Sequence, residues 1–229
     1  MPAPFYVSPE QIFRDKEQYA RRGIEKGKDV IAVEYENGIV IVAENPQKTL
    51  NKIYEIYDRI AFAGVGSYQE YEPLRYQGVQ ATEIKGYTYS REDVHAKWLA
   101  NIYSQIIGSA YRQLDMKPLE IEILLVEVGD DIYPKNNIYH LSFDGRLWEE
   151  ENFATIGGRS EQLSEYLQRE FRENLTQAEA LKIAAKALST LEDSQITPET
   201  LEVAILDKNQ GRRKFKRLTS EEIGELLKE

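Results

Sequence analysis

Hydrophobic and polar positions follow two different periods at the start of the chain. Residues 8–26 bring apolar side chains to one stripe of a helix, which consists of Ile12, Phe13, Tyr19, Ala20 and Ile24. Residues 30–36 and 39–44 are instead nearly continuous runs of β-branched and apolar residues, which predict two strands. Asn37-Gly38 between these strands predicts a type I′ turn in which both residues adopt positive φ.

The rest of the chain alternates runs typical of strands with amphipathic helical runs. Further strands are predicted at 53–58, 59–66, 119–129, 137–143, 146–158, 201–207 and 212–218, of which those between 119 and 158 resemble one meander. Helices are predicted at 67–84, 90–110, 161–173 and 176–191, with a short one capped by Thr219. The helix at 90–110 has a capping-box-like start, Ser90-Arg91-Glu92-Asp93.

This order of elements predicts an α+β fold. Two antiparallel sheets packed face to face, with a layer of helices outside each, would bury all of the apolar faces in a four-layer αββα sandwich. At 229 residues the chain is long enough for one sizeable domain, and no segment has the composition of a linker. We therefore expect a single domain over residues 1–229, with residues 1–7 as a tail and residues 8–26 as an N-terminal helical extension.

Composition narrows the possible functions. Hydrophobic residues make up 41% and charged residues 30%, which is typical of a soluble globular protein. The sequence has no apolar run of about 20 residues and no signal-peptide pattern at its start, so we expect a cytoplasmic protein without a membrane partner. A net charge of −10 argues against nucleic-acid binding as the main function. The absence of cysteine excludes disulfides, thiol nucleophiles and thiolate metal ligands.

Other candidate chemistry is weak. The chain has two histidines, His95 and His140, in no ligand-type spacing, so we expect neither a metal site nor a cofactor. We expect His95 on a helix surface and His140 on a strand. Residues 23–29 superficially resemble a phosphate-binding loop, but their glycines are too close together and Asp29 replaces the Ser or Thr that binds magnesium. The basic run 212–217 is expected to form a solvated strand face.

Several motifs, in shared order and spacing, resemble one family. They are Ser8-Pro9-Glu10-Gln11, Ala20-Arg21-Arg22-Gly23-Ile24, Val30-Ile31-Ala32-Val33, Val42-Ala43-Glu44-Asn45-Pro46 and the run from Lys52 to Arg59. The chain resembles proteasome α subunits of the actinobacterial type over nearly its whole length, and this family has the αββα fold of the N-terminal nucleophile hydrolases. Pro4-Phe5-Tyr6-Val7 replaces the tyrosine, aspartate and arginine of archaeal and eukaryotic α subunits, which favours a bacterial source.

The resemblance implies a noncatalytic subunit of a threonine-type endopeptidase complex. Such subunits form a homo-heptameric ring that caps rings of β subunits, admits unfolded protein substrates and docks a hexameric AAA ATPase; in bacteria of this type the substrates carry a small protein modifier. Lys52 would meet the terminal carboxylate of the activator, and Gly27 and Gly66 would form walls of the same pocket. The gate would consist of Pro2, Ala3, Pro4, Phe5, Tyr6 and Val7. Ring assembly would use Ile12, Phe13, Tyr19 and Ile24.

The catalytic β subunits of the same family use an N-terminal threonine as nucleophile. Here the corresponding segment is Gly27-Lys28-Asp29-Val30, which has no hydroxyl, although Glu44 and Lys52 match the acidic and lysine partners of that nucleophile. We therefore expect no catalytic residue. Two alternatives stay open at this point: a hydrolase or β-type subunit exposed by processing before Val30, and a binding module with a ring fold but no protease partner.

Overall fold

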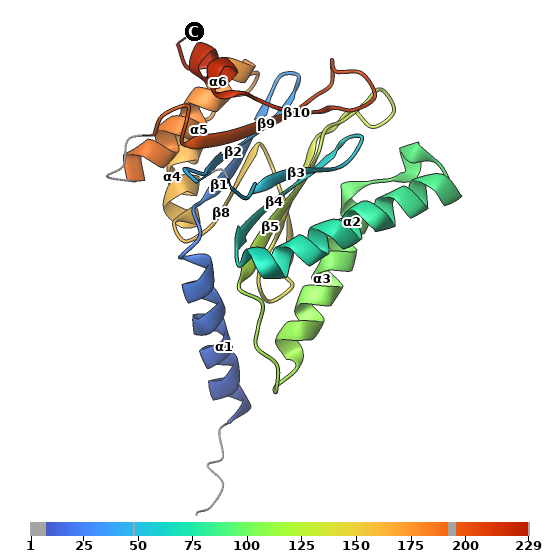
Figure 1. The fold of residues 1–229 in the computed structure, drawn as a ribbon, viewed down its shortest axis with the longest axis vertical. Helices are drawn as coiled ribbons and strands as arrows, with labels where there is room; N and C mark the ends of the chain where they lie inside the picture. Colours follow the sequence, from blue (N-terminus) through green and yellow to red (C-terminus); the bar gives the residue numbers. More distant parts are fainter. Residues whose placement is uncertain (1–7, 48, 192–195, 229) are drawn as a thin grey trace, which may run out of the picture.

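The computed structural model describes residues 8–47, 49–191 and 196–228, and its centre is a pair of five-stranded sheets packed face to face (Figure 1). Neighbouring strands in both sheets are antiparallel. The first sheet has the order β10 (Phe215–Arg217), β9 (Leu201–Asp207), β2 (Gly38–Glu44), β1 (Val30–Tyr35) and β8 (Phe153–Ile156). The second has the order β3 (Ile53–Tyr57), β4 (Ile60–Gly66), β5 (Ile121–Glu127), β6 (Asn137–Leu141) and β7 (Leu147–Glu150).

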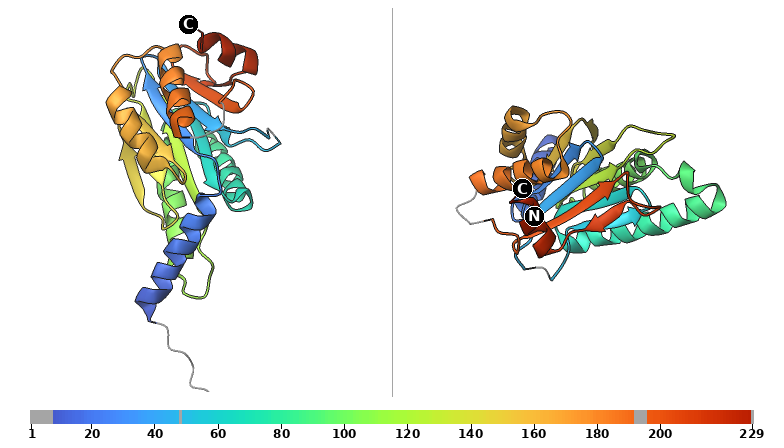
Figure 2. Two further views of the ribbon diagram at one scale, coloured as in Figure 1. Left: turned by 90° about the vertical axis from the view of Figure 1, so that its left-hand side faces the viewer. Right: turned by 90° about the horizontal axis from the view of Figure 1, so that it is seen from above.

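Helices cover the outer face of each sheet. The first sheet packs against α4 (Ser160–Glu170), α5 (Gln177–Leu191) and the C-terminal α6 (Ser220–Leu226). The second sheet packs against α2 (Tyr68–Thr88), the short 3₁₀ helix η1 (Arg91–Asp93) and α3 (Ala96–Arg112). Helix α1 (Pro9–Ile24) extends from one end of the sandwich, as the left view of Figure 2 shows. None of the described helices is long and apolar enough to cross a membrane.

Alternation along the strands explains the four layers. In β1, Val30 and Ala32 lie in the core between the sheets, whereas Ile31 and Val33 lie in the core under α4 and α5. Both faces of such a strand are buried, so the strand appears in the sequence as a continuous apolar run. The predicted αββα sandwich with an N-terminal helix is therefore confirmed.

The turn between β1 and β2 differs from the prediction. Tyr35 pairs with Gly38, so the loop residues are Glu36 and Asn37, and neither Asn37 nor Gly38 has positive φ. The type I′ prediction is wrong because contacts from other elements hold this loop. The Glu36 N–H donates to the Leu175 carbonyl (2.9 Å), and the Asn37 carbonyl accepts from the Lys208 N–H (2.8 Å).

The start of α3 also differs from the prediction. Ser90 caps the short η1, where its hydroxyl accepts from the Glu92 N–H (3.3 Å), and α3 begins at Ala96. The Ala96 N–H is satisfied by the Glu127 carboxylate on β5 (2.9 Å), so a distant side chain replaces the local cap. Two other helices have local caps: the capping boxes at Thr176 and Thr219 are confirmed.

The predicted meander over 119–158 is split between the sheets. Strands β5, β6 and β7 are neighbours in the second sheet, but β8 crosses to the first sheet and pairs with β1. This crossing brings residues 157–159 next to the start of β1, where the Arg159 N–H donates to Asp29 Oδ1 (3.1 Å).

Candidate functional site

The entry to β1 is where a catalytic relative would carry its nucleophile. Here the Lys28 ammonium forms an ion pair with Glu44 Oε1 (3.0 Å), and the Lys28 carbonyl accepts from Lys52 Nζ (2.6 Å). The next residue, Asp29, is 1% exposed and bonds the Arg159 side chain at 2.8 Å. Glu44 and Lys52 therefore both contact Lys28, and the residues between Gly27 and Val30 provide no side-chain hydroxyl or thiol.

Lys52 lies just before the edge strand β3 and is half-buried. Burial lowers the pKa of Lys52 from 10.5 to about 8, while the nearby carboxylates of Asp29, Glu202 and Glu44 act in the opposite direction. An ammonium in such a place keeps three donors, of which the Lys28 carbonyl accepts one. The side chain is chemically suited to a carboxylate partner, since a charge-assisted bond is stronger away from bulk water.

The two predicted pocket-wall glycines lie beside Lys28 and against each other. A methyl group on Gly27 would stand 2.8 Å from Val65 Cγ1 and 2.9 Å from the Gly66 nitrogen. Gly66 has a φ of 102°, and a side chain there would collide with the Glu120 carbonyl. A pocket of about 270 Å³ opens at this place, lined by residues 25–29 with Gly158 and Arg159 but by neither Lys52 nor Gly66. The structure therefore brings Gly27, Gly66 and, through Lys28, Lys52 to one region.

The predicted assembly residues on α1 divide into two groups. Tyr19 is 47% exposed, Ile12 and Phe13 are half-buried, and the Phe13 ring packs on Tyr111 at 5.7 Å. Ile24 is only 4% exposed, because it belongs to the core between the two sheets of its own chain. The prediction that Ile24 contacts a neighbouring copy is therefore wrong: its apolar surface is already buried inside this chain.

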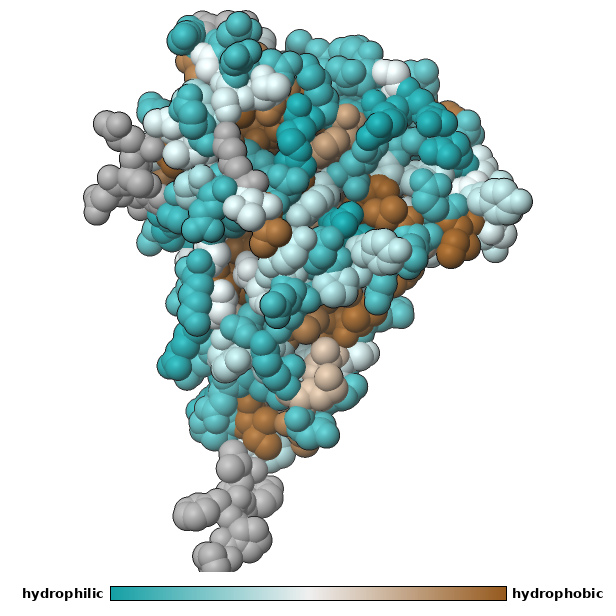
Figure 3. Space-filling model, in the orientation of Figure 1, coloured by the Kyte–Doolittle hydropathy of each residue, from teal (hydrophilic) through white to brown (hydrophobic). Residues whose placement is uncertain are grey.

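Ile12 and Tyr19 line an exposed groove at the free end of the molecule. The groove, of about 560 Å³, lies between α1 and the loop after α3, and that loop contributes Leu114, Lys117 and Pro118. Figure 3 shows hydrophobic surface at this end of the molecule. Lys16 is buried and donates to the carbonyls of Tyr111 (3.1 Å) and Gln113, so it fixes α1 against the C-terminal end of α3.

The prediction for one histidine is confirmed and that for the other is wrong. His140 lies on β6, as predicted. The prediction that His95 is a helix-surface residue is wrong. It precedes α3, its Nδ1 lies 3.0 Å from Glu127 Oε1, and its ring packs edge-on against Tyr133 at 4.8 Å. In the part of the chain that the structure describes, no group of three potential ligands is arranged to hold a metal ion.

The gate residues, Pro2 to Val7, lie outside the described residues. The basic run 212–217 is engaged within the chain rather than free: Arg213 pairs with Glu55 and Arg217 pairs with Glu202. The Arg213–Glu55 pair binds the β9–β10 hairpin to β3 across the two sheets, whereas the Arg217–Glu202 pair joins the two strands of the hairpin.

Comparison with known proteins identifies the family of the chain. The family model "Proteasome subunit" matches residues 24–206. A proteasome subunit alpha of Streptosporangium roseum is 46% identical, over 100% of this chain and 88% of its own. Proteins of the same name from Streptomyces coelicolor (45%, 99% of this chain and 91% of its own) and Acidothermus cellulolyticus (44%, 100% and 99%) are similarly close. The chain therefore belongs to the proteasome subunit family, among the α subunits of the core particle.

Proposed function

We propose that the chain forms a homo-heptameric outer ring that caps the β-subunit rings of a threonine-type endopeptidase in the cytoplasm. Peptide hydrolysis belongs to β-subunit threonines, and this chain contributes none of the catalytic groups. The contacts of Lys28 support this assignment, because the peptide chain before Val30 runs between Glu44 and Lys52, where a free terminal threonine would have to stand. An α subunit assembles with other proteasome subunits, and the exposed groove at Ile12 and Tyr19 offers a contact for a second copy.

The single observation that best supports an activator-docking role is the place of Lys52. Its half-buried side chain bonds the carbonyl of Lys28, and Lys28 lines the pocket formed by residues 25–29 with Gly158 and Arg159. A terminal carboxylate that enters from solvent would meet the Lys52 ammonium there. We therefore assign to this region the docking of the C-terminal tail of a hexameric AAA ATPase.

The docked ATPase would deliver unfolded proteins, marked in such bacteria by a small protein modifier, to an entrance that residues 2–7 narrow. Support for the gate comes from the sequence alone: the segment is short and uncharged, and Pro2 and Pro4 disfavour a helix.

Lys52→Ala tests the docking role in the assembled core of α and β subunits. Loss of one charge-assisted contact costs about 1.5–3 kcal/mol, or about 10- to 150-fold in affinity at each pocket. Because several tails bind together, the loss is amplified over the ring. The variant core should keep its rings and its hydrolysis of small peptides but should not bind the ATPase. Lys52→Arg should restore docking only in part, since the planar guanidinium differs in shape from an ammonium.

The matched control is Lys97→Ala, on α3. Its side chain is 68% exposed and lies 3.9 Å from Glu149, so its removal should change neither assembly nor docking. If Lys52→Ala cores recruit the ATPase and degrade tagged proteins as fast as wild-type cores, the docking assignment is refuted.

A further inference from the structure

Glu202 is a buried carboxylate, 7% exposed, that reaches from one sheet to the other. It lies on β9 of the first sheet, paired with Ala43 of β2. Its side chain contacts the start of β3 in the second sheet: Oε2 accepts from the Lys52 N–H (2.9 Å), and Oε1 accepts from the Ile53 N–H (3.0 Å). One carboxylate therefore holds two consecutive backbone groups at the candidate docking site.

Arg217 and Asn45 complete this arrangement. Arg217, on β10, bonds the Glu202 carboxylate and also donates Nη2 to the Ile53 carbonyl (2.5 Å). Asn45 Nδ2 bonds both Glu202 Oε2 and the Leu50 carbonyl (2.7 Å each). Since β3 is the outer strand of its sheet, the Ile53 groups that point away from β4 would otherwise face the open edge. Glu202 accepts from the Ile53 N–H and Arg217 donates to the Ile53 carbonyl, so this pair satisfies both backbone groups as a further strand would.

Lys52 is consequently held at three points. Its N–H bonds Glu202, its carbonyl accepts from the Gly64 N–H (3.1 Å), and its ammonium bonds the Lys28 carbonyl. The two backbone bonds determine where the side chain starts, and so determine where its ammonium can lie.

We propose that Glu202 is the positioning residue for Lys52: it fixes the backbone at the start of β3 so that the Lys52 ammonium lies at the Lys28 carbonyl beside Gly27. The proposal rests on the docking function assigned to Lys52. It assigns to a residue 150 positions away in sequence the geometry of the pocket.

Glu202→Gln is an informative substitution because it keeps the volume and removes the acceptor capacity. Four N–H groups converge on this carboxylate, from Lys52, Ile53, Asn45 and Arg217. A glutamine offers one acceptor oxygen and an NH₂ group, so at least one donor would face another donor. The start of β3 should move to relieve that conflict, and Lys52 should leave its half-buried place.

The direct readout is the pH profile of Lys52 acetylation by acetic anhydride in the assembled core, measured by peptide mapping and normalised to the plateau at high pH. In the wild type the midpoint should be about 8, where burial places the pKa of Lys52. Glu202→Gln should raise it by about one unit or more, towards that of an exposed lysine. Loss of a neighbouring negative charge without movement would instead lower the midpoint, so a lowered or unchanged midpoint overturns the proposal.

Two more variants make the result unambiguous. Glu55→Gln is the matched control, because Glu55 lies on β3, close to Lys52 in sequence, and like Glu202 pairs with an arginine, Arg213, but does not bond Lys52. Its midpoint should equal that of the wild type, and an equal rise in this variant would count against Glu202. Asn45→Ala leaves the Glu202 carboxylate in place and removes one of its four donors; it should give a smaller rise. If Glu202→Gln does not fold, an unchanged midpoint in Asn45→Ala overturns the proposal.

A binding measurement separates this inference from the docking function itself. The probes are a fluorescein-labelled decapeptide with a free terminal carboxylate and the same peptide as a C-terminal amide. Wild-type cores should prefer the carboxylate, and Glu202→Gln should weaken its binding at least about tenfold without changing the binding of the amide. If wild-type cores bind both probes equally, the docking function fails, whereas the acetylation profile still decides whether Glu202 positions Lys52.

Discussion

Substitutions on α1 should separate assembly of the ring from folding of the chain. Ile12→Asp with Tyr19→Asp changes side chains that line the exposed groove, whereas Ile24→Ala changes one in the core between the sheets. Full burial of a large apolar side chain contributes about 1.5–3 kcal/mol. About half of the Tyr19 surface remains to be covered, so Tyr19 should contribute about 1 kcal/mol to each subunit contact, and Ile12 a similar amount.

The two kinds of variant should therefore behave in opposite ways. A loss of about 2 kcal/mol weakens each contact about 30-fold, and a closed ring repeats that loss at every contact. The double variant should elute as a monomer with a melting temperature within a few degrees of the wild type, since surface changes cost little. Ile24→Ala should cost about 2–5 kcal/mol of folding stability, or a fall of about 10 °C for a chain of this size, and should still assemble below its melting temperature.

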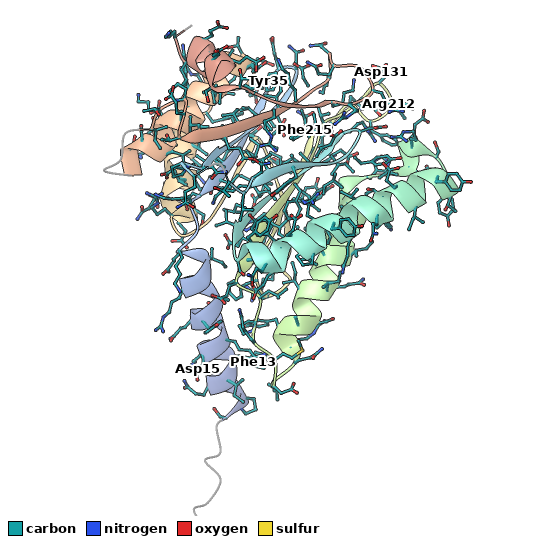
Figure 4. The ribbon with its side chains drawn as sticks, in the orientation of Figure 1. Phe13, Asp15, Tyr35, Asp131, Arg212 and Phe215 are labelled. Atoms are coloured by element: carbon teal, nitrogen blue, oxygen red, sulfur yellow. The ribbon has the colours of Figure 1, made fainter. Side chains whose placement is uncertain are left out.

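The assay is size-exclusion chromatography with light scattering on the chain co-expressed with its β subunits, together with thermal unfolding. Ile132→Asp is the matched control, because Ile132 is 59% exposed on the loop after β5. Its neighbour Asp131 and the α1 residue Phe13 lie at opposite ends of the molecule (Figure 4). Intact rings from the Ile12/Tyr19 double variant, or loss of rings in the control, would refute the reasoning.

Three further outcomes follow from the site and the tail. The purified chain without β subunits should not be labelled by threonine-directed covalent inhibitors, because residues 27–30 provide no nucleophile; stoichiometric labelling in intact-mass spectra would contradict this. Deletion of residues 2–7 should speed degradation of unstructured proteins by the assembled core more than hydrolysis of tiny peptides, and equal turnover with and without the tail would exclude these residues as the gate. Since the pKa of Lys52 is about 8, its charged form is lost above that pH, and ATPase docking should weaken about tenfold per unit there. In a pull-down of the ATPase by assembled cores from pH 7 to 9, the docking that Lys52→Arg retains should not depend on pH, because arginine stays charged.

Local sequence signals predicted most of the fold. Periodicity placed the strands and helices, and the capping boxes at Thr176 and Thr219 were predicted from four residues each. The errors arise where a distant residue supplies what the local sequence normally supplies. The carboxylate of Glu127 starts α3 at Ala96, well after the local signal at Ser90, and backbone groups of residues 175 and 208 shape the β1–β2 turn. No pattern within a few residues of these positions carries that information.

The candidate site shows the same limit. Lys52, Gly27 and Gly66 were identified only through family resemblance, since a lysine before a strand has no distinguishing local pattern. Glu202 was missed for a physical reason: it lies in a run of buried strand residues, and only the packing of β9 against the start of β3 brings it to Lys52. An acidic residue inside an apolar strand was the available signal, because a buried carboxylate requires partners.

The contacts of Lys28 indicate why catalysis and docking exclude each other at this position. In the segment before Val30, the Lys28 ammonium pairs with Glu44, and the Lys28 carbonyl accepts a hydrogen bond from the Lys52 ammonium. Removal of the segment before Val30 would abolish both contacts at once, at the place where the resemblance to catalytic subunits puts the terminal nucleophile. Retention of the segment keeps the Lys52 ammonium on the carbonyl of Lys28, a residue that lines the pocket together with Gly27. In the proposed function the retained α1 segment is therefore part of the docking geometry as well as a surface for assembly, and each state of this segment would allow only one of the two functions.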